Sequence, residues 1–137
     1  MTILGLDIGE KRTGVAISNN VSSICTPLEY INSNNNFLEQ ISKIISEKNI
    51  DTIIIGLPKL LSGKEGKRAK ISRKISKEIQ SEYNSVKVIL WDERLTTKQA
   101  EKYLLETNPN KRKIKDKIDS ASAVLILENY LETKGNS

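Results

Sequence analysis

The sequence predicts an α/β fold in which a mixed five-stranded sheet has helices packed on its faces. Three short strand-like runs come first in the chain, which favours an antiparallel meander. Two later apolar runs alternate with amphipathic helical segments, the pattern of βαβ crossovers and parallel pairing. The chain has 137 residues, of which 37% are hydrophobic and 28% charged. We therefore expect one domain over residues 1–137 with one hydrophobic core.

The strands are expected at residues 3–8, 13–18, 24–31, 51–57 and 86–91. Four residues separate the first two strands, so these two are expected to form a hairpin. Pro27 has no N–H group to donate to a neighbouring strand, which places the third strand at an edge of the sheet. Residues 51–57 show no polar alternation, as is typical of a parallel strand buried on both faces.

Apolar residues at helical spacing predict a helix over residues 37–48, where Asn36 and Glu39 resemble a capping box. The next helix follows Gly66, and its expected core stripe is Ile71, Ile75, Ile79 and Tyr83. Thr96 with Gln99 predicts a cap for a helix over residues 97–106. A basic loop at residues 111–117 is then expected to lead into a final helix that begins at Asp119 and ends near residue 132.

The composition restricts the chemistry that the chain can perform. It contains no histidine and a single cysteine, Cys25, which excludes a histidine general base, a histidine-activated nucleophile and a zinc site built from these residues. Metal chemistry would have to use carboxylate oxygens, which select hard ions such as Mg²⁺ or Mn²⁺. An internal disulfide is excluded as well.

The amino terminus starts on a strand-like run rather than on a basic segment followed by an apolar one, so we expect no signal peptide. No apolar run approaches the roughly 18 to 20 residues that span a bilayer. These features predict a cytoplasmic protein without a membrane partner.

Positive charge is concentrated in two segments. Residues 59–77 carry eight Lys or Arg against Glu65, and residues 111–117 carry five against Asp116, whereas the whole chain has a net charge of +5. Concentrated positive charge is the pattern expected for a partner with a phosphate backbone. The alternative is a lysine-rich surface that is simply solvated.

Acidic residues follow the first and last predicted strands. Asp7 ends the first, and Asp92 and Glu93 follow the last. Since sites in open α/β sheets form at the carboxyl ends of strands, these carboxylates are expected to converge, and Asp119 could reach the same point. Clustered carboxylates persist mainly when a cation neutralises them. Two divalent ions held there could hydrolyse a phosphodiester bond.

Each acidic residue also has a structural alternative. Asp7 could form a turn, Asp92 could cap the turn after its strand, and Glu93 could pair with Arg94 or a lysine. Asp119 could be a helix N-cap. Asp116 fits a surface charge better than a ligand, although it remains a candidate.

The basic residues expected to contact nucleic acid are Lys11, Arg12, Arg68, Arg94, Lys111 and Arg112. For Lys11 and Arg12, a role in keeping the hairpin soluble is an equal alternative. Arg94 stands beside the acidic residues and suits a phosphate clamp. Aromatic residues make up only 4% of the chain, so few stacking platforms for single strands are expected, and Trp91 is assigned to the core.

Four motifs in order resemble those of the YqgF/RuvX family. They are residues 7–16 (Asp-Ile-Gly-Glu-Lys-Arg-Thr-Gly-Val-Ala), residues 56–58 with Gly63, residues 92–97 with Ala100, and residues 119–127 with Tyr130 and Leu131. They span nearly the whole chain. There are two departures: residues 59–62 stand where relatives often have a polar Asn and an Asp, and Ser122 replaces a frequent alanine.

The resemblance implies an RNase H-like fold related to Holliday-junction resolvases, in a bacterial cytoplasmic nuclease that matures the 5′ end of pre-16S ribosomal RNA. Carried over by motif, its acidic residues are Asp7, Glu93 and Asp119, with Asp92 as a further candidate. A structured ribosomal RNA precursor is favoured as substrate over a DNA junction, with the ribosome as a further partner and the chain as a monomer or weak dimer. A DNA junction resolvase and a non-catalytic nucleic-acid-binding module remain alternatives. An actin-like phosphate loop is disfavoured because that fold needs a second domain.

Overall fold

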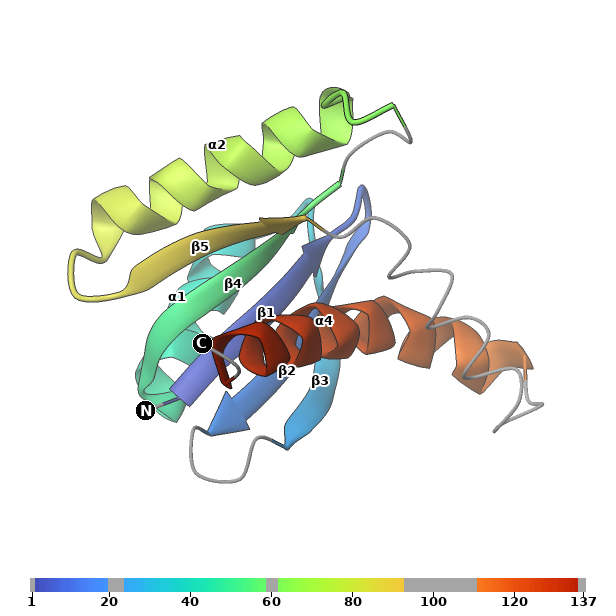
Figure 1. Ribbon diagram of the computed structural model, residues 1–137, viewed down its shortest axis with the longest axis horizontal. Helices are drawn as coiled ribbons and strands as arrows, with labels where there is room; N and C mark the ends of the chain where they lie inside the picture. The colour runs from blue at the N-terminus through green and yellow to red at the C-terminus, as the bar shows by residue number, and fades with distance from the viewer. Residues whose placement is uncertain (1, 20–23, 59–61, 93–110, 136–137) are drawn as a thin grey trace.

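The computed structural model describes residues 2–19, 24–58, 62–92 and 111–135, with side chains except at 111–119, 134 and 135. Its strands are β1 (Thr2–Ile8), β2 (Arg12–Asn19), β3 (Cys25–Asn32), β4 (Ile50–Leu57) and β5 (Lys87–Asp92). They form one sheet in the order β3-β2-β1-β4-β5 (Figure 1). β1 pairs antiparallel with β2, and β2 with β3, whereas β1–β4 and β4–β5 are parallel. The predicted mixed sheet, with its third strand at an edge, is confirmed.

Helices cover both faces of this sheet. The described helices are α1 (Phe37–Lys48), α2 (Lys67–Glu82) and α4 (Lys111–Gly135). α1 and α2 pack on one face, and α4 crosses the other (Figure 1). None of the helices in this part of the chain is long and apolar enough to cross a membrane.

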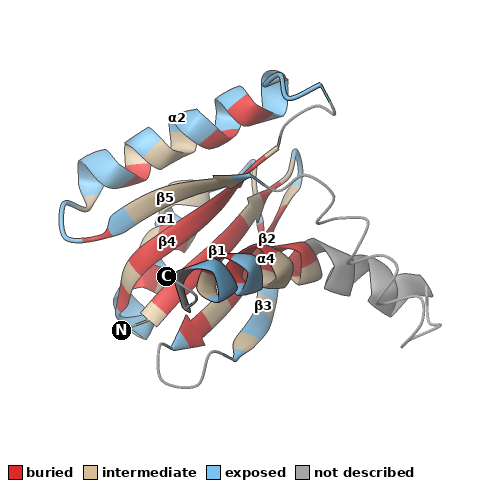
Figure 2. Ribbon diagram, viewed as in Figure 1, coloured by how far each residue is buried: buried red, intermediate tan, exposed pale blue. Residues whose placement is uncertain are grey.

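The core has two apolar layers, one on each side of the sheet. In β4, Ile53 and Ile55 face α1 and α2, and Ile54 faces α4. All three are completely buried, which explains why the sequence of this strand shows no polar alternation. Figure 2 shows the buried central strands and the exposed outer surface of α2.

The capping box predicted at the start of α1 is wrong. Asn36 is the N-cap residue, but its backbone is left-handed (φ 53°, ψ 38°) and its side chain makes no capping hydrogen bond. A capping side chain requires an extended backbone at this position. Asparagine tolerates the left-handed region better than most residues.

The predicted basic loop before the final helix is also wrong. Residues 111–117 form the first turns of α4, and Asp119 is the ninth residue of that helix. Lysine and arginine are good helix formers, so a run of them does not interrupt a helix. An N-cap role for Asp119 is therefore excluded.

Two apolar residues differ from the prediction, which places Ile71 in the core and Ile24 in the third strand. Ile71 is 39% exposed, and Ile24 is 66% exposed and precedes β3 instead of belonging to it. In α2 the buried residues are Ala69, Ser72 and Ile79. The helix predicted over residues 97–106, with Thr96 and Gln99, lies outside the described residues.

Candidate active site at the carboxyl edge of the sheet

Two predicted acidic residues lie at the same edge of the sheet. β1, β4 and β5 are parallel, so their carboxyl ends point in one direction. Asp7 is the penultimate residue of β1, next to Leu6, which pairs with Ile55 of β4. Asp92 ends β5 and pairs with Leu57 of β4. With adjacent strands about 4.8 Å apart, β1 and β5 are about 10 Å apart across β4.

The two carboxylates belong to opposite faces of that sheet. Asp7 alternates with Ile3 and Gly5, which contact α4. Asp92 alternates with Val88 and Leu90, which pack in the core layer beneath α1 and α2. Side chains in a strand alternate between faces, so Asp92 is directed away from the face that Asp7 shares with α4.

α4 approaches β1 closely because Gly5 has no side chain. A Cβ atom at Gly5 would lie 3.1 Å from the carbonyl oxygen of Ala123 and 3.2 Å from the Cβ of Leu127. The buried Ser120 also holds α4 against the edge strand, because its Oγ donates a 2.6 Å hydrogen bond to the carbonyl oxygen of Leu28. The backbone of residue 119 is one residue before this contact and one helical turn before Ala123.

A tight turn follows β1 directly. The N–H of Gly9 donates a 3.0 Å hydrogen bond to the carbonyl oxygen of Arg12, and the N–H of Ser33 donates to the carbonyl oxygen of Lys11 at 2.9 Å. A Cβ atom at Gly9 would overlap the Arg12 carbonyl oxygen. Glycine at this position therefore allows the backbone to turn immediately after Asp7.

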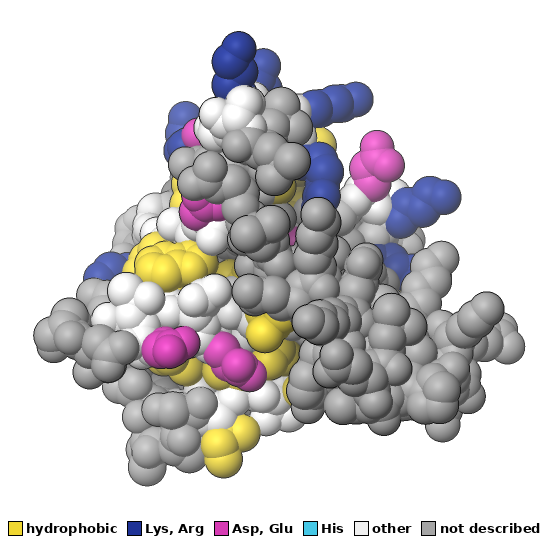
Figure 3. All heavy atoms as spheres, turned by 45° about the vertical axis from the view of Figure 1, so that its right-hand side comes forward, with side chains coloured by type: hydrophobic (Ala, Val, Ile, Leu, Met, Phe, Trp, Pro, Cys, Tyr) yellow, Lys and Arg dark blue, Asp and Glu magenta, His cyan; other side chains and the backbone are white. Residues whose placement is uncertain are grey.

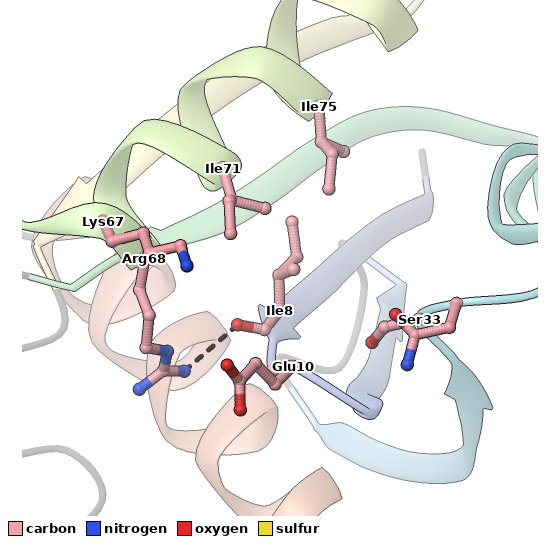
Figure 4. Close-up of a pocket in the computed structure, with 9 residues that line it drawn as sticks. Ile8, Glu10, Ser33, Lys67, Arg68, Ile71 and Ile75 are labelled. Atoms are coloured by element: carbon pink, nitrogen blue, oxygen red, sulfur yellow. Dashed lines mark hydrogen bonds between the residues drawn. The ribbon is translucent and has the colours of Figure 1, made fainter.

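A cavity lies between this turn and the start of α2. Its lining consists of Ile8, Gly9, Glu10, Ser33, Asn34, Lys67, Arg68, Ile71 and Ile75. Figure 4 shows Ile71 and Ile75 pointing from α2 toward Ile8. Because Ile71 lines this open cavity, its side chain stays partly exposed. From the first turn of α2, Arg68 donates a 3.1 Å hydrogen bond through Nη2 to the carbonyl oxygen of Ile8. This bond connects α2 to the end of β1.

The hydrogen bond of Arg68 joins residues that are 60 positions apart. The sequence analysis predicts Arg68 to contact nucleic acid but does not predict this structural role, for which no local pattern gives a signal. Arg12 has an aromatic neighbour, since its guanidinium carbon lies 4.7 Å from the centroid of the Tyr30 ring, a cation–π geometry. Lys11 is exposed at the turn.

The predicted triad is described in part. Asp7 is half-buried, whereas Glu93 lies outside the described residues, as does the side chain of Asp119. Arg94 and the side chains of Lys111, Arg112 and Asp116 lie outside them too. Among the residues that are described, no three Asp, Glu, Cys or His side chains form a group that could hold a metal ion. Convergence of the triad stays a prediction.

The chain matches one known protein family and its relatives over nearly its whole length. The family model described as "RuvX: Holliday junction resolvase" matches residues 1–133. A protein of Sulfurihydrogenibium sp. (strain YO3AOP1) is 43% identical over 131 residues, which covers 95% of this chain and 89% of the relative. A protein of Bacillus subtilis (strain 168) is 40% identical over 137 residues, covering 97% and 99% of the two chains. Both relatives are named as candidate pre-16S rRNA nucleases.

Solved structures confirm the predicted RNase H-like fold. The fowlpox virus resolvase in complex with Holliday junction DNA matches with a TM-score of 0.65 and 21% identity, covering 98% of this chain and 99% of that one. RuvC of Thermus thermophilus in complex with a Holliday junction matches with a TM-score of 0.63 and 12% identity, covering 100% and 97%. At these identities the likeness concerns the fold alone.

Proposed function

Because the chain belongs to the family described as RuvX Holliday junction resolvases, we propose that it is a metal-dependent endonuclease that matures the 5′ end of pre-16S ribosomal RNA. Nuclease activity is supported by the family and by relatives about 40% identical over nearly the whole chain. The structural observation that carries the proposal is the position of Asp7. Its carboxylate is half-buried at the carboxyl edge of the sheet, on the face that α4 covers.

We assign Asp7, Glu93 and Asp119 as the catalytic carboxylates. Figure 1 shows that α4 runs back across the sheet, so that its carboxyl end lies near the amino end of β1. One turn from Ala123 toward residue 119 spans about 5.4 Å, and two residues from Gly5 to Asp7 span about 7 Å. Both steps lead toward the carboxyl end of β1, which supports a site shared by Asp7 and Asp119.

Asp92 is a weaker candidate than Glu93. Its alternation with Val88 and Leu90 directs it toward the face beneath α2, whereas Asp7 belongs to the other face. The preference for Glu93 rests on this separation and on the third family motif, residues 92–97.

Carboxylates are the donors that hard divalent ions prefer, so the proposed triad fits Mg²⁺ or Mn²⁺. Such ions would supply an attacking water of lowered pKa and positive charge for the leaving oxygen. The protein's own part is to present the carboxylates rigidly. It does so through the tight turn after Asp7 and the close packing of α4 on Gly5.

The substrate we favour is a structured ribosomal RNA precursor, because relatives that match over nearly their full length are named for pre-16S rRNA. We place this activity in the cytoplasm. Lys11, Arg12 and Arg68, with Arg94, Lys111 and Arg112, are the basic residues proposed to contact it. The second candidate function is cleavage of a DNA four-way junction, which the family description favours.

Replacing the Asp7 carboxylate tests the proposal. In Mg²⁺ or Mn²⁺, we expect Asp7→Asn to abolish cleavage of a pre-16S RNA fragment and to leave its binding intact. The matched control is Asp51→Asn, because Asp51 is likewise half-buried but lies at the opposite edge, where it accepts a hydrogen bond from the N–H of Thr2. Unchanged cleavage by Asp7→Asn would refute the nuclease proposal. A parallel assay on a DNA four-way junction distinguishes the two substrates.

A further inference from the structure

Four lysines form a row along the exposed surface of α2. Lys67, Lys70, Lys74 and Lys77 follow one another at intervals of three, four and three residues, and all four are exposed. Residues at these intervals lie on one face of a helix. We call this row the lysine stripe. It is about 15 Å long, at 1.5 Å of rise per residue.

The lysine stripe points away from the body of the protein. The buried residues of α2 are Ala69, Ser72 and Ile79, and at 3.6 residues per turn they lie on the side of the helix opposite the lysines. Figure 3 shows Lys and Arg side chains projecting into solvent from the part of the molecule where α2 lies. The stripe is therefore accessible to a large partner.

Among the described residues, none forms an ion pair with a lysine of the stripe. On the same helix, Arg73 does pair with Glu65 at 2.6 Å. Like charges three and four residues apart destabilise an isolated helix by a few tenths of a kcal/mol per pair. A negatively charged partner would offset this repulsion, because it attracts each of the four lysines.

One end of the stripe lies at the edge of the sheet that carries Asp7, on the face opposite the Asp7 carboxylate. Lys67 lines the same cavity as Ile8 and Gly9, which follow Asp7 directly. The neighbouring Arg68 donates its hydrogen bond to the carbonyl oxygen of Ile8. From this point α2 leads away along the sheet, as Figure 1 shows. A strand bound on the stripe would extend outward from the carboxyl edge of β1.

We propose that the lysine stripe binds the phosphodiester backbone of the substrate outside the cleavage site, an inference that rests on the proposed nuclease function. Phosphates of one strand of a DNA duplex are spaced about 3.4 Å along its axis, so a 15 Å row can face about four of them. Lysine binds phosphate as a point charge, and the stripe has no aromatic or amide side chain. Contact is therefore independent of base sequence and serves to position the substrate.

The test compares two triple variants that remove the same charge. The stripe variant is Lys70→Gln, Lys74→Gln and Lys77→Gln, which leaves Lys67 at the cavity untouched. The control is Lys43→Gln, Lys48→Gln and Lys87→Gln, three exposed lysines on α1 and at the start of β5. Glutamine has nearly the helix propensity of lysine, so both variants should fold, which circular dichroism verifies.

Binding is measured by fluorescence anisotropy on RNA and DNA duplexes of about 20 base pairs and the same sequence, between about 50 and 200 mM salt. We expect the stripe variant to bind both at least about tenfold more weakly. The slope of log affinity against log salt should fall by about 2 to 3, since each lost phosphate contact removes about 0.9. The control should change affinity by less than about threefold.

Equal losses in the two variants, or wild-type binding by the stripe variant, would overturn the proposal. A loss confined to one duplex would overturn recognition through the backbone alone.

Asp7→Asn in the same assay separates this inference from the proposed function. We expect it to bind like the wild type but not to cleave. If Asp7→Asn cleaves normally while the stripe variant loses binding, the nuclease assignment fails and the lysine stripe stands. If cleavage depends on Asp7 but the stripe variant binds and cleaves like the wild type, only the lysine stripe fails.

Discussion

Gly5 of β1 packs directly against Ala123 of α4, and the space between them is too small for a side chain. A Cβ atom at Gly5 would lie 3.1 Å from the carbonyl oxygen of Ala123, which belongs to the rigid backbone of the helix. Both residues are buried. The distance between α4 and β1, and with it the position of residue 119 relative to Asp7, therefore depends on the absence of a side chain at residue 5.

We expect Gly5→Ala to lower the free energy of unfolding by about 1 to 3 kcal/mol, because α4 must move by a few tenths of an ångström. Urea denaturation measures this cost. Nuclease activity at a temperature where the variant remains folded should fall further than stability accounts for, since α4 carries Asp119. A variant with wild-type stability and activity would show that α4 adapts freely and that the close contact does not set the site.

Arg68 is expected to stabilise the fold as well as to bind substrate. Replacing it by glutamine removes the hydrogen bond to the Ile8 carbonyl oxygen, and we expect the free energy of unfolding to fall by about 1 kcal/mol. Arg73→Gln serves as the control, since it removes an equal charge from α2 but only an exposed pair with Glu65, and it should leave the urea midpoint unchanged. If Arg68→Gln weakens substrate binding without any loss of stability, Arg68 is a phosphate contact alone.

The sheet was predictable because its signals are local. The uninterrupted apolar run of β4 indicates a strand buried on both faces, and Pro27 indicates the edge strand β3; both predictions are confirmed. Errors arose where local signals compete. The charged residues 111–117 favour solvent and also favour a helix, and only packing in the fold decides between the two. Asn36 can cap a helix or adopt the left-handed backbone that it has here.

The site was predictable as an edge of the sheet but not as a set of side chains. Parallel pairing places Asp7 and Asp92 at one edge, as expected from the strand order. Whether Asp92 shares a face with Asp7 depends on the phase of alternation in β5, and the packing of Val88 and Leu90 shows that it does not. The contact of Arg68 with Ile8 follows from the tertiary fold and has no counterpart in local sequence.

Cys25 is expected to be a slowly reacting thiol. The pKa of the Cys25 thiol is raised from 9.0 to about 11, chiefly by burial and also by the negative charge of Glu128, while a hydrogen bond with Ser18 acts in the opposite direction. At pH 8 the thiolate fraction is then about a hundredfold smaller than for an ordinary thiol, while the more basic thiolate is more nucleophilic. We expect a net reaction with a disulfide reagent about tenfold slower than in the urea-unfolded chain.

The pH dependence checks the cause of this slow reaction. The rate for the folded protein should keep rising between pH 9 and about 11, where that of the unfolded chain levels off. Glu128→Gln removes the negative charge that raises the Cys25 pKa and should shift the folded profile to lower pH. Equal rates in the folded and unfolded protein at pH 8 would contradict the raised pKa.

For two buried serines, Ser120 and Ser72, we expect substitution by alanine to change stability in opposite directions. The Oγ of Ser120 donates a 2.6 Å hydrogen bond to the Leu28 carbonyl oxygen, whereas the buried Oγ of Ser72 has no hydrogen-bond partner in the described structure. Ser120→Ala removes this buried hydrogen bond, so the free energy of unfolding should fall by about 1 to 2 kcal/mol. Ser72→Ala removes an unpaired hydroxyl and raises helix propensity, so stability should rise by about 1 kcal/mol. Urea denaturation of both variants measures these changes in the free energy of unfolding. Destabilisation by Ser72→Ala would mean that the Ser72 hydroxyl has a hydrogen-bond partner in solution.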